Sequence, residues 1–421
     1  MITFDWSTKP SLNTQAMAYG TMFPNVRKGD IMTFVIRTSQ YKATVRVTSK
    51  VDFYANRLYT FPLDLSNLVA NTTIEKNNAT SGGSGDIEGT LSELGTFTVA
   101  TFNVDGLPDI SYIVDSTNPN GPGASGTTTM ANRIASENPQ WDIIGFSEDF
   151  ANHSQLTAGL SSAYTFGTYR GSVSEAQLVS TADTDGLGFA TRNTACSFSN
   201  EKIVEFTSSH GGLTSGANTC IKKGFRHYIV TLADGTAIDV LITHMNTYSG
   251  SGTDHINAQH AQLRQIALYV NSIRDNKRPI IFMGDTNCRY TRHDFQTYFW
   301  NVLDKDLIVN DPWVEFLWAG VYPQYPSKSY MVEDATGTDP AYDIIYEGHQ
   351  KGEVVDKVIY INNPDAPIHI IANSYLRSYD NYKGLGDHMP IVVNFSYGKI
   401  ATTSASTVVG VDSWDEELDL L

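Results

Sequence analysis

Hydrophobic and polar residues alternate one by one near the start of the chain. Ala43, Val45 and Val47 are separated by single polar residues, which is the period of a strand with one buried face. Two further apolar runs, at residues 31–36 and 58–65, have the length of strands. No helical period occurs in this region, so the pattern predicts a small all-β, sandwich-like domain over residues 1–72.

A polar, glycine-rich stretch follows this domain. Residues 77–85 consist only of Asn, Ala, Thr, Ser and Gly. Such a segment buries too little apolar surface to offset the entropy that is lost on ordering it. We therefore expect a flexible linker over residues 73–94. At the other end, residues 399–421 close on several acidic side chains and are expected to form a solvated tail.

The pattern changes from Phe97 onward, where short apolar runs alternate with segments of helical period. In residues 257–270, apolar side chains recur every three or four positions, as in a helix with one buried face. This alternation is typical of an α/β layered domain, which we expect over residues 95–398. The predicted strands span residues 97–102, 142–146, 238–243, 280–283, 354–361 and 391–395, and a second predicted helix spans 130–137.

Polar side chains stand where the predicted strands of this domain end or begin. Strand ends at one edge of an α/β sheet converge on a crevice where ligands bind. Each residue alone has an ordinary explanation, such as a turn asparagine or a hydrogen-bonded core histidine. Their coincidence favours a catalytic site, and their oxygen atoms suit Mg²⁺, Mn²⁺ or Ca²⁺ better than Zn²⁺. The residues are Asn103, Glu148, His244, Asp285 and Asn287 after strands, and Asp387 and His388 before the last one.

Charge and cysteine content exclude two kinds of protein. A net charge of -16 argues against a dedicated nucleic-acid binder with a broad basic face, but not against an enzyme that holds phosphate through a metal. The three cysteines, Cys196, Cys220 and Cys288, lack the spacing of a zinc-thiolate site. Cys196 and Cys220 either form a disulfide or remain two buried thiols.

The sequence contains neither a membrane helix nor a signal pattern. No apolar run approaches the roughly 18 residues that a membrane helix needs. The opening Met-Ile-Thr-Phe-Asp-Trp lacks a basic and apolar leader, so the protein is either cytoplasmic or its leader lies outside this sequence. The many Ser, Thr, Asn and Tyr residues are typical of exported chains, and we expect a secreted or cell-envelope protein, with the cytoplasm as the alternative.

Seven short motifs occur along the chain, in the order TFNVDGLP, DIIGFSED, DGLGFATR, LITHMN, IFMGDTNCR, VVDKVIYI and LGDHMPIVV. This set resembles the endonuclease/exonuclease/phosphatase superfamily, which is typified by pancreatic deoxyribonuclease and bacterial sphingomyelinases. The resemblance implies a four-layer α/β/β/α sandwich, in which two mixed sheets pack face to face and the active site lies at one end. The N-terminal β module weakly resembles fimbrillin-like surface proteins, which implies a role in attachment to a cell surface.

The resemblance also implies a role for each candidate residue. Glu148 is the expected direct ligand of the metal, with Asn103 and Asp387 completing or buttressing the site. Asp285 is expected to orient or deprotonate the attacking water, and Asn287 to donate a hydrogen bond to a non-bridging phosphate oxygen.

Two histidines have expected carboxylate partners. His388 matches the histidine that binds the phosphate, and Asp356 matches the carboxylate that fixes its tautomer and raises its pKa. His244 resembles the second histidine of the deoxyribonuclease branch, and Asp185 stands where its partner is expected. Arg226 is either an arginine that contacts the substrate phosphate or a plain surface arginine.

Three functions remain open from the sequence. The first is a divalent-metal-dependent phosphodiesterase with a lipid or small phosphoester as substrate, and the second is a deoxyribonuclease of the same superfamily. The third is a surface binding protein with a vestigial catalytic domain, which is disfavoured because every catalytic position holds a competent residue. We expect a monomeric enzyme that depends on Mg²⁺, with Mn²⁺ or Ca²⁺ as alternatives.

Overall fold

The chain forms two compact units, residues 1–76 with 404–421 and residues 77–403. The computed structural model describes residues 31–37, 41–48, 72–76, 90–107, 121–173, 181–212, 215–247, 253–288, 294–317 and 355–401. In the first unit, β1 (Ile31–Arg37), β2 (Tyr41–Thr48) and β3 (Thr72–Lys76) form an antiparallel sheet in this order. β3 extends into the range predicted as a linker, and the fimbrillin-like resemblance stays a prediction. The predicted tail lies outside the described residues from residue 402 on.

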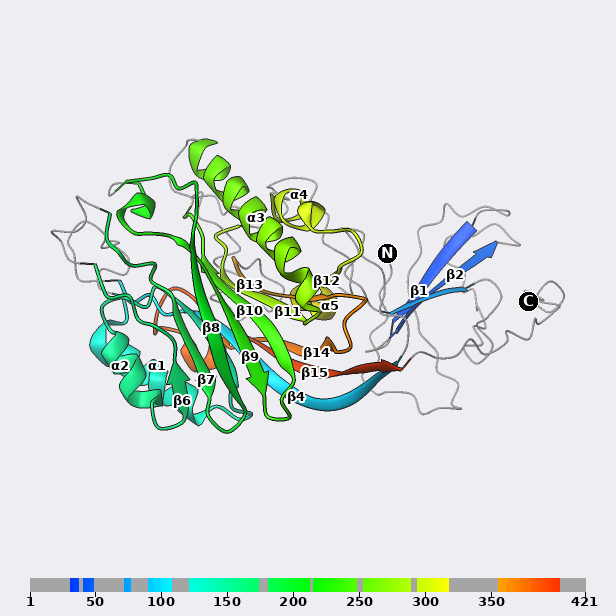
Figure 1. Cartoon of the computed structure of the whole chain (residues 1–421), viewed down its shortest axis with the longest axis horizontal. Helices are drawn as coiled ribbons and strands as arrows, with labels where there is room; N and C mark the ends of the chain where they lie inside the picture. The colour runs from blue at the N-terminus through cyan, green and yellow to red at the C-terminus, as the bar shows by residue number, and fades with distance from the viewer. Residues whose placement is uncertain are drawn as a thin grey trace, which may run out of the picture. The chain divides into compact units, whose positions relative to one another are not determined.

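The second unit contains two six-stranded sheets (Figure 1). The first sheet has the order β12 (Ile308–Asn310), β13 (Asp356–Asn362), β11 (Ile280–Asp285), β10 (Ala237–His244), β9 (Gly224–Leu232), β8 (Cys196–Glu205). The second has the order β14 (His369–Arg377), β15 (Ile391–Ala401), β4 (Thr90–Asn103), β5 (Ile143–Ser147), β7 (Gly188–Arg192), β6 (Tyr164–Phe166). Both sheets are mixed, because β10 and β11 are parallel, as are β4 and β5, while the other neighbours are antiparallel.

The two sheets pack face to face through the side chains that alternate inward along each strand. Ile242 and Met283 of the first sheet share one buried cluster with Val99, Ile143 and Val393 of the second. Burial of this apolar area is the main driving force for the packing, at about 25 cal/mol per Å². The sheets therefore form the two inner layers of the unit.

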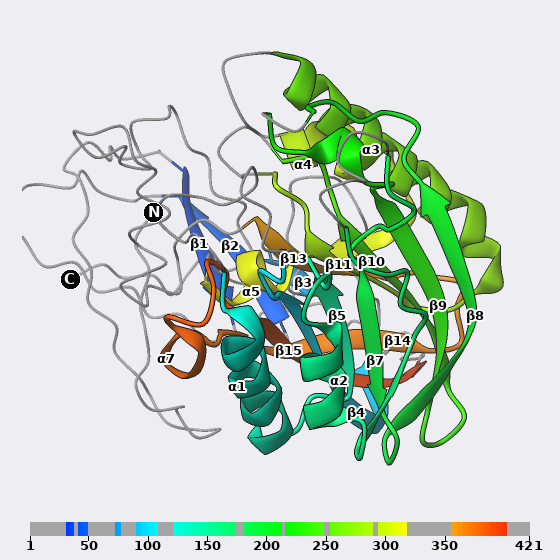
Figure 2. The same cartoon turned by 90° about the vertical axis from the view of Figure 1, so that its left-hand side faces the viewer.

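Helices cover the two outer faces, as Figure 2 shows. α3 (Thr253–Ile273) packs its apolar face, including Leu263 and Ile266, against the first sheet, and α4 (Asp294–Tyr298) lies beside it. α1 (Gly123–Ser136) and α2 (His153–Leu160) pack against the second sheet. The predicted four-layer α/β/β/α sandwich is therefore confirmed. Short elements complete the described fold: α5 (Pro312–Leu317), α7 (Tyr379–Tyr382), and the 3-10 turns η3 (Asn218–Cys220), η4 (Arg274–Asn276) and η6 (Trp300–Val302).

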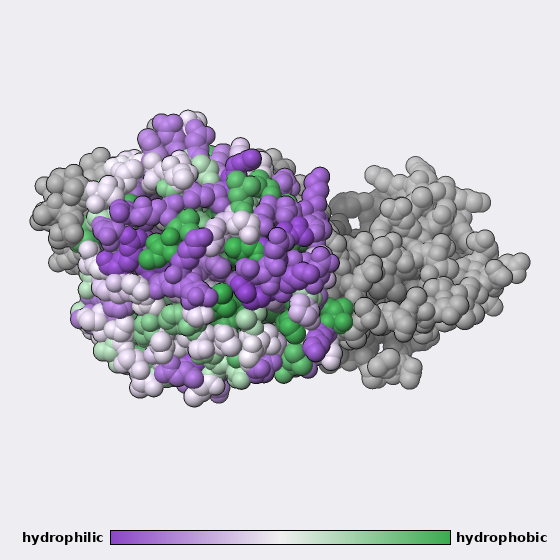
Figure 3. Space-filling view, in the orientation of Figure 1, coloured by the Kyte–Doolittle hydropathy of each residue, from purple (hydrophilic) through white to green (hydrophobic). Residues whose placement is uncertain are grey.

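The three cysteines of the second unit form no disulfide bond. All three cysteines are free and buried; Cys196 lies in the core between the sheets, and Cys220 lies in a separate small cluster. The face of the unit seen in Figure 3 carries mostly hydrophilic residues, with apolar residues in small groups. Among the described residues, no helix has both the length and the apolar character of a membrane span.

Candidate active site

The alternation of side chains along the strands places the predicted residues on one face. Side chains at every second position of a strand share a face of the sheet. His244 therefore points to the same side as Ile242, and Asp285 to the same side as Met283, into the space between the sheets. The same period of two puts Asn103 and Asp356 on the inner faces of β4 and β13.

Strand register then brings these residues to one edge of the sandwich. Asp285 is the register partner of His244 on β10 and of Asp356 on β13. Gly284 permits this arrangement, because a Cβ atom there would lie 2.0 Å from the carbonyl oxygen of Thr243 and because its φ is +138°. Side chains of these three strands must therefore converge at the same point.

Asn103 ties the two sheets together at this edge. Its Nδ2 donates to Glu148 Oε1 at 3.1 Å and to Asp285 Oδ2 at 3.1 Å, while its Oδ1 accepts a hydrogen bond from the Asp105 amide at 3.0 Å. In this arrangement Asn103 holds two carboxylates in place, which is the buttressing alternative of the two predicted for it.

Glu148 and the two histidines surround Asp285. His244 Nε2 lies 3.7 Å from Glu148 Oε1 and 3.8 Å from Asp285 Oδ2, and His388 Nε2 lies 3.7 Å from Asp285 Oδ2. The side chain of Asp387 is 42% exposed and reaches within 3.9 Å of His388 Nε2. The structure thus brings together residues that are far apart in the sequence.

Glu148 lies in a turn with a left-handed backbone, at φ +57°. The amide of Gly106 donates to the carbonyl oxygen of Glu148 at 3.1 Å, and a Cβ atom on Gly106 would lie 2.5 Å from that oxygen. A strained backbone conformation of this kind persists only where the surroundings hold it. The turn directs the Glu148 side chain towards Asn103 and His244.

His388 and Asp356 form the predicted pair. His388 Nδ1 lies 2.6 Å from Asp356 Oδ2. Burial alone would lower the pKa of His388, but Asp356, Asp387 and Asp285 outweigh it and raise this pKa well above its usual value. This shift favours the protonated form of His388, and the rise in pKa agrees with the one expected from Asp356.

The pKa of His244 is shifted in the opposite direction. Burial, assisted by the charge of Lys223, lowers the pKa of His244 to about 3. Its Nδ1 is buried and has no hydrogen-bond partner in the described part of the chain. Two histidines whose pKa values are pushed apart are suited to different tasks in proton transfer.

Asn287 is held by the turn after β11. Its backbone φ is +50°, its amide donates to Asp285 Oδ1 at 2.9 Å, and its Nδ2 donates to the Met245 carbonyl at 3.3 Å. Gln259 of α3 donates to the Asn287 carbonyl at 3.0 Å. The turn therefore fixes Asn287 beside Asp285, where the sequence predicts it.

The residues of this cluster fit a divalent cation. Ligand atoms of Glu148, His244 and Asp285 lie within 4.8 Å of one another. Burial, followed by repulsion from Asp387, raises the pKa of Glu148 to about 7, and a cation bound beside it would favour the ionised carboxylate. Glu148 would hold the cation, with Asp387 and the buttressing Asn103 beside it, and the cation would stabilise the charge of a bound phosphate.

The partner predicted for His244 is wrong. Asp185 accepts two hydrogen bonds from Arg226, at 2.9 Å from Nε and 2.6 Å from Nη2. Arg226 is fully buried and also contacts Glu201 and the Thr168 carbonyl oxygen. The guanidinium of Arg226 and the carboxylate of Asp185 thus bind groups inside the protein. Asp185 is therefore not the partner of His244, and Arg226 is not placed to contact the substrate. The pair is a buried ion pair between the sheet and a neighbouring loop.

Replacing Arg226 with methionine is expected to lower the free energy of unfolding by about 3 to 5 kcal/mol, because it breaks a buried ion pair and leaves Asp185 only the longer contact with Arg170, at 3.6 Å. Urea unfolding measures this loss. The KM of the folded fraction for a phosphodiester should stay within about twofold of wild type. A large rise in KM with unchanged stability would restore the substrate-binding role.

Lys223 is the residue of this cluster that the sequence motifs do not predict. Its Nζ lies 3.1 Å from His244 Nε2 and donates to the Met245 carbonyl at 2.6 Å. Burial lowers the pKa of Lys223 to about 8, although Glu148 and Asp285 act in the other direction. The antiparallel pairing of β9 and β10 could have indicated this residue, because the start of β9 then lies beside the end of β10.

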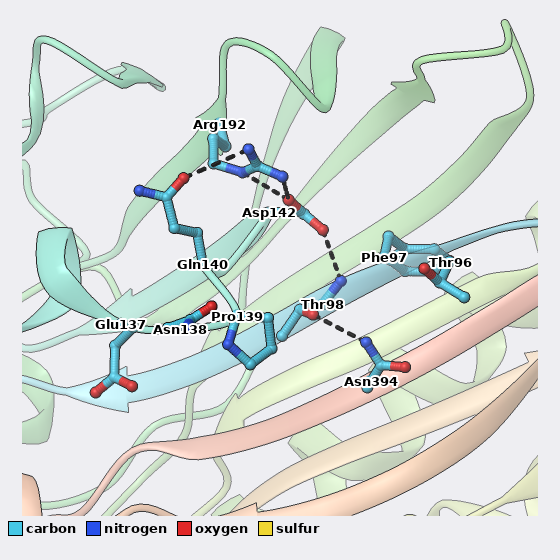
Figure 4. A pocket seen from close by; sticks show the side chains of 10 residues that line it. All are labelled: Thr96, Phe97, Thr98, Glu137, Asn138, Pro139, Gln140, Asp142, Arg192 and Asn394. Carbon is cyan, nitrogen blue, oxygen red and sulfur yellow. Dashed lines mark hydrogen bonds and ion pairs between the residues drawn. The ribbon is translucent and has the colours of Figure 1, made fainter.

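Figure 4 shows a polar hollow of about 580 Å³, and no residue of the catalytic cluster lines it. It is lined by Thr96 and Thr98, in the middle of β4 and several residues before Asn103, and by Arg192. The guanidinium of Arg192 is held by Asp142, and the amide of Thr98 donates to the same carboxylate at 2.8 Å. This hollow is therefore separate from the catalytic candidates.

Comparison with known proteins supports the family suggested by the motifs. A sequence model described as the Endonuclease/Exonuclease/phosphatase family matches residues 100–307. Comparison with curated proteins gives no match.

Solved structures of low sequence identity are similar to the chain over most of their own length. TDP2 from D. rerio, complexed with single strand DNA product, has 15% identity and a TM-score of 0.47, covering 72% of this chain and 99% of that chain. The human Nocturnin catalytic domain with bound sulfate anion has 14% identity and a TM-score of 0.46, with coverages of 73% and 97%. Sphingomyelinase C from Streptomyces griseocarneus has 17% identity and a TM-score of 0.44, with coverages of 71% and 99%. On the family match and its own motifs, the chain belongs to the endonuclease/exonuclease/phosphatase family.

Proposed function

We propose that the protein is a divalent-metal-dependent phosphodiesterase whose substrate is a lipid or a small phosphoester. Membership of the family supports phosphoester cleavage in general. The observation that carries the finer proposal is the convergence of Glu148, Asp285, His244 and the His388–Asp356 pair at one edge of the sandwich.

The charges of the site suit an anionic substrate. A phosphodiester repels hydroxide, so positive charge must accompany the attack of water. A divalent cation would supply Lewis-acid stabilisation here. His388 adds a second positive charge, which Asp356 and Asp387 maintain.

Two side chains are proposed to act on the attacking water and the phosphate. Burial opposes ionisation of Asp285, but the histidines and the hydrogen bonds from Asn287 and Asn103 outweigh it and lower the pKa of Asp285. An ionised Asp285 can accept a hydrogen bond from water and orient it. His388 Nε2, on the far side from Asp356, is then free to bind a phosphate oxygen.

The purified protein is expected to hydrolyse bis-p-nitrophenyl phosphate in Mg²⁺ or Mn²⁺, and EDTA should abolish this activity. Release of p-nitrophenol measures it, and re-addition of the metal is the control for damage by the chelator. Undiminished turnover in EDTA after dialysis would contradict the metal-dependent mechanism.

Supercoiled plasmid and sphingomyelin, assayed side by side, separate the two substrate classes. Release of choline phosphate without nicking supports a lipid phosphodiesterase. Nicking without release of choline phosphate would replace the proposal with a deoxyribonuclease of the same family. Absence of all phosphodiesterase activity would favour the surface binding protein.

A further inference from the structure

The backbone places Lys223 at the edge of the sheet that carries the active site. Lys223 directly precedes β9, whose Phe225 is the register partner of Thr243 on β10. Its carbonyl oxygen accepts a hydrogen bond from the Phe206 amide at 2.9 Å. The start of β9 therefore delivers the Lys223 side chain beside the end of β10, where His244 lies.

The ammonium group of Lys223 is buried and aimed at the catalytic cluster. Only 5% of the residue is exposed. Nζ donates to the Met245 carbonyl oxygen at 2.6 Å and lies 3.1 Å from His244 Nε2. A protonated lysine has three N–H donors, and these two contacts use two of them.

This ammonium has no carboxylate partner at contact distance. Within the described residues, no carboxylate oxygen forms an ion pair with it at 4.0 Å or less. Glu148 and Asp285 act on its pKa only from a longer distance. The neighbouring Lys222 differs, since it is partly exposed and pairs with Asp183 at 3.1 Å and with Glu205 at 3.5 Å.

A buried charge without a contact partner is costly, and proteins that retain one usually bind a counter-ion or a charged ligand there. We infer that Lys223 is a substrate-binding residue whose ammonium group binds an anionic phosphate oxygen beside His244. The inference rests on the proposed phosphodiesterase function and deepens it. The third N–H donor is the one left for the phosphate.

The charge-assisted hydrogen bond predicts the size of the effect. Loss of such a bond corresponds to about a tenfold to 100-fold weaker binding. Lys223→Met should therefore weaken the binding of inorganic phosphate by this factor and raise the KM for bis-p-nitrophenyl phosphate more than it lowers kcat. Lys223→Arg, which keeps the charge, should recover part of the loss.

The experiment compares full-length wild type, Lys223→Met, Lys223→Arg and Lys222→Met in Mg²⁺. Inorganic phosphate is titrated while the thermal unfolding midpoint is followed, because a ligand that binds the folded state raises it. Phosphate should raise the midpoint of wild type and of Lys222→Met but have little effect on that of Lys223→Met. If Lys223→Met does not fold, Lys223→Gln, which keeps a donor for Met245, takes its place.

Stability and turnover distinguish the outcomes. Without phosphate, Lys223→Met should be at least as stable as wild type. If Lys223 were purely structural, Lys223→Met would be less stable than wild type and would bind phosphate equally well. That result would overturn the inference. Wild-type phosphate affinity in Lys223→Met overturns it as well. If wild type hydrolyses no diester but loses phosphate binding through Lys223→Met, the anion site stands and the proposed function fails.

Discussion

Replacement of His388 by alanine is expected to lower kcat for bis-p-nitrophenyl phosphate by about 100-fold to 1,000-fold, which is the range for loss of one group that stabilises the charge of the transition state. The reason is the pair with Asp356 at 2.6 Å, which keeps His388 protonated and turns its Nε2 towards Asp285. Because the substitution leaves the buried Asp356 without its partner, kcat is compared per folded molecule and urea unfolding is measured alongside it.

A second buried histidine-carboxylate pair provides the control. His227 Nε2 lies 2.8 Å from Asp239 Oδ1, and its Nδ1 lies 3.0 Å from the Tyr269 hydroxyl, on the face of β9 opposite to Tyr228. His227→Ala should destabilise the fold and leave kcat per folded molecule near wild type. Equal kcat values for wild type and His388→Ala over a series of metals would remove His388 from the mechanism.

Asp356→Asn tests the origin of the charge on His388. Asp356 raises the pKa of His388, so its loss should lower that pKa. A protonated His388 is required in this mechanism, and the alkaline limb of the kcat profile should therefore move to lower pH. A profile that stays in place would show that another group titrates.

Glu148→Gln is expected to lower the Mg²⁺-dependent kcat/KM by about 1,000-fold. A bound cation contributes several kcal/mol to the stabilisation of charge in the transition state, and each 1.4 kcal/mol is a factor of ten. Steady-state kinetics over a range of Mg²⁺ concentrations measure the loss. Glu205→Gln is the control and should keep wild-type turnover, because Glu205 ends β8 at the same end of the sheet but is half-exposed, pairs with Lys222 and lies outside the carboxylate cluster.

Glu148→Gln should also stabilise the metal-free protein. The pKa of Glu148 is raised from 4.5 to about 7, so the folded protein binds a proton that the unfolded chain releases between these pH values. The free energy of unfolding of wild type in EDTA should therefore fall as the pH rises from about 4.5 to about 7. Glu148→Gln should remove this part of the pH dependence, and urea unfolding at several pH values checks it.

The period of two along the strands explains how much of the site is predictable. Once strands are placed at residues 238–243 and 280–283, the alternation of side chains puts His244 on the same face as Ile242, and Asp285 on the same face as Met283. Both of these apolar side chains lie in the core between the sheets. The chemistry of the cluster follows from residue types at strand ends. The alternation of side chains does not identify which residue of one sheet contacts which residue of the other. The sequence therefore pairs Asp185 with His244, whereas in the structure Asp185 pairs with Arg226.

Four of the six strands without a predicted counterpart lie at the edges of the two sheets, while the other two, β7 and β9, lie inside them. β8 and β12 border the first sheet, and β14 and β6 border the second. An edge strand is covered by a neighbour on one side only, so its apolar signal is short or diluted by polar residues. β8, for example, has no fully buried position after Cys196. Lys223 is not predicted for a related reason. Its place in the site depends on the neighbouring strand β10, which carries His244, and not on the sequence around Lys223 itself.

The shared register of β10, β11 and β13 limits how this protein can diversify. Asp285 is aligned with both His244 and Asp356. Insertion or deletion of one residue within any of these strands would turn its polar terminus away from the other two and expose the wrong face to the helices. Changes in length are therefore tolerated only in the connections between strands, so new substrates can be acquired through loops while the spacing of the strands themselves stays invariant.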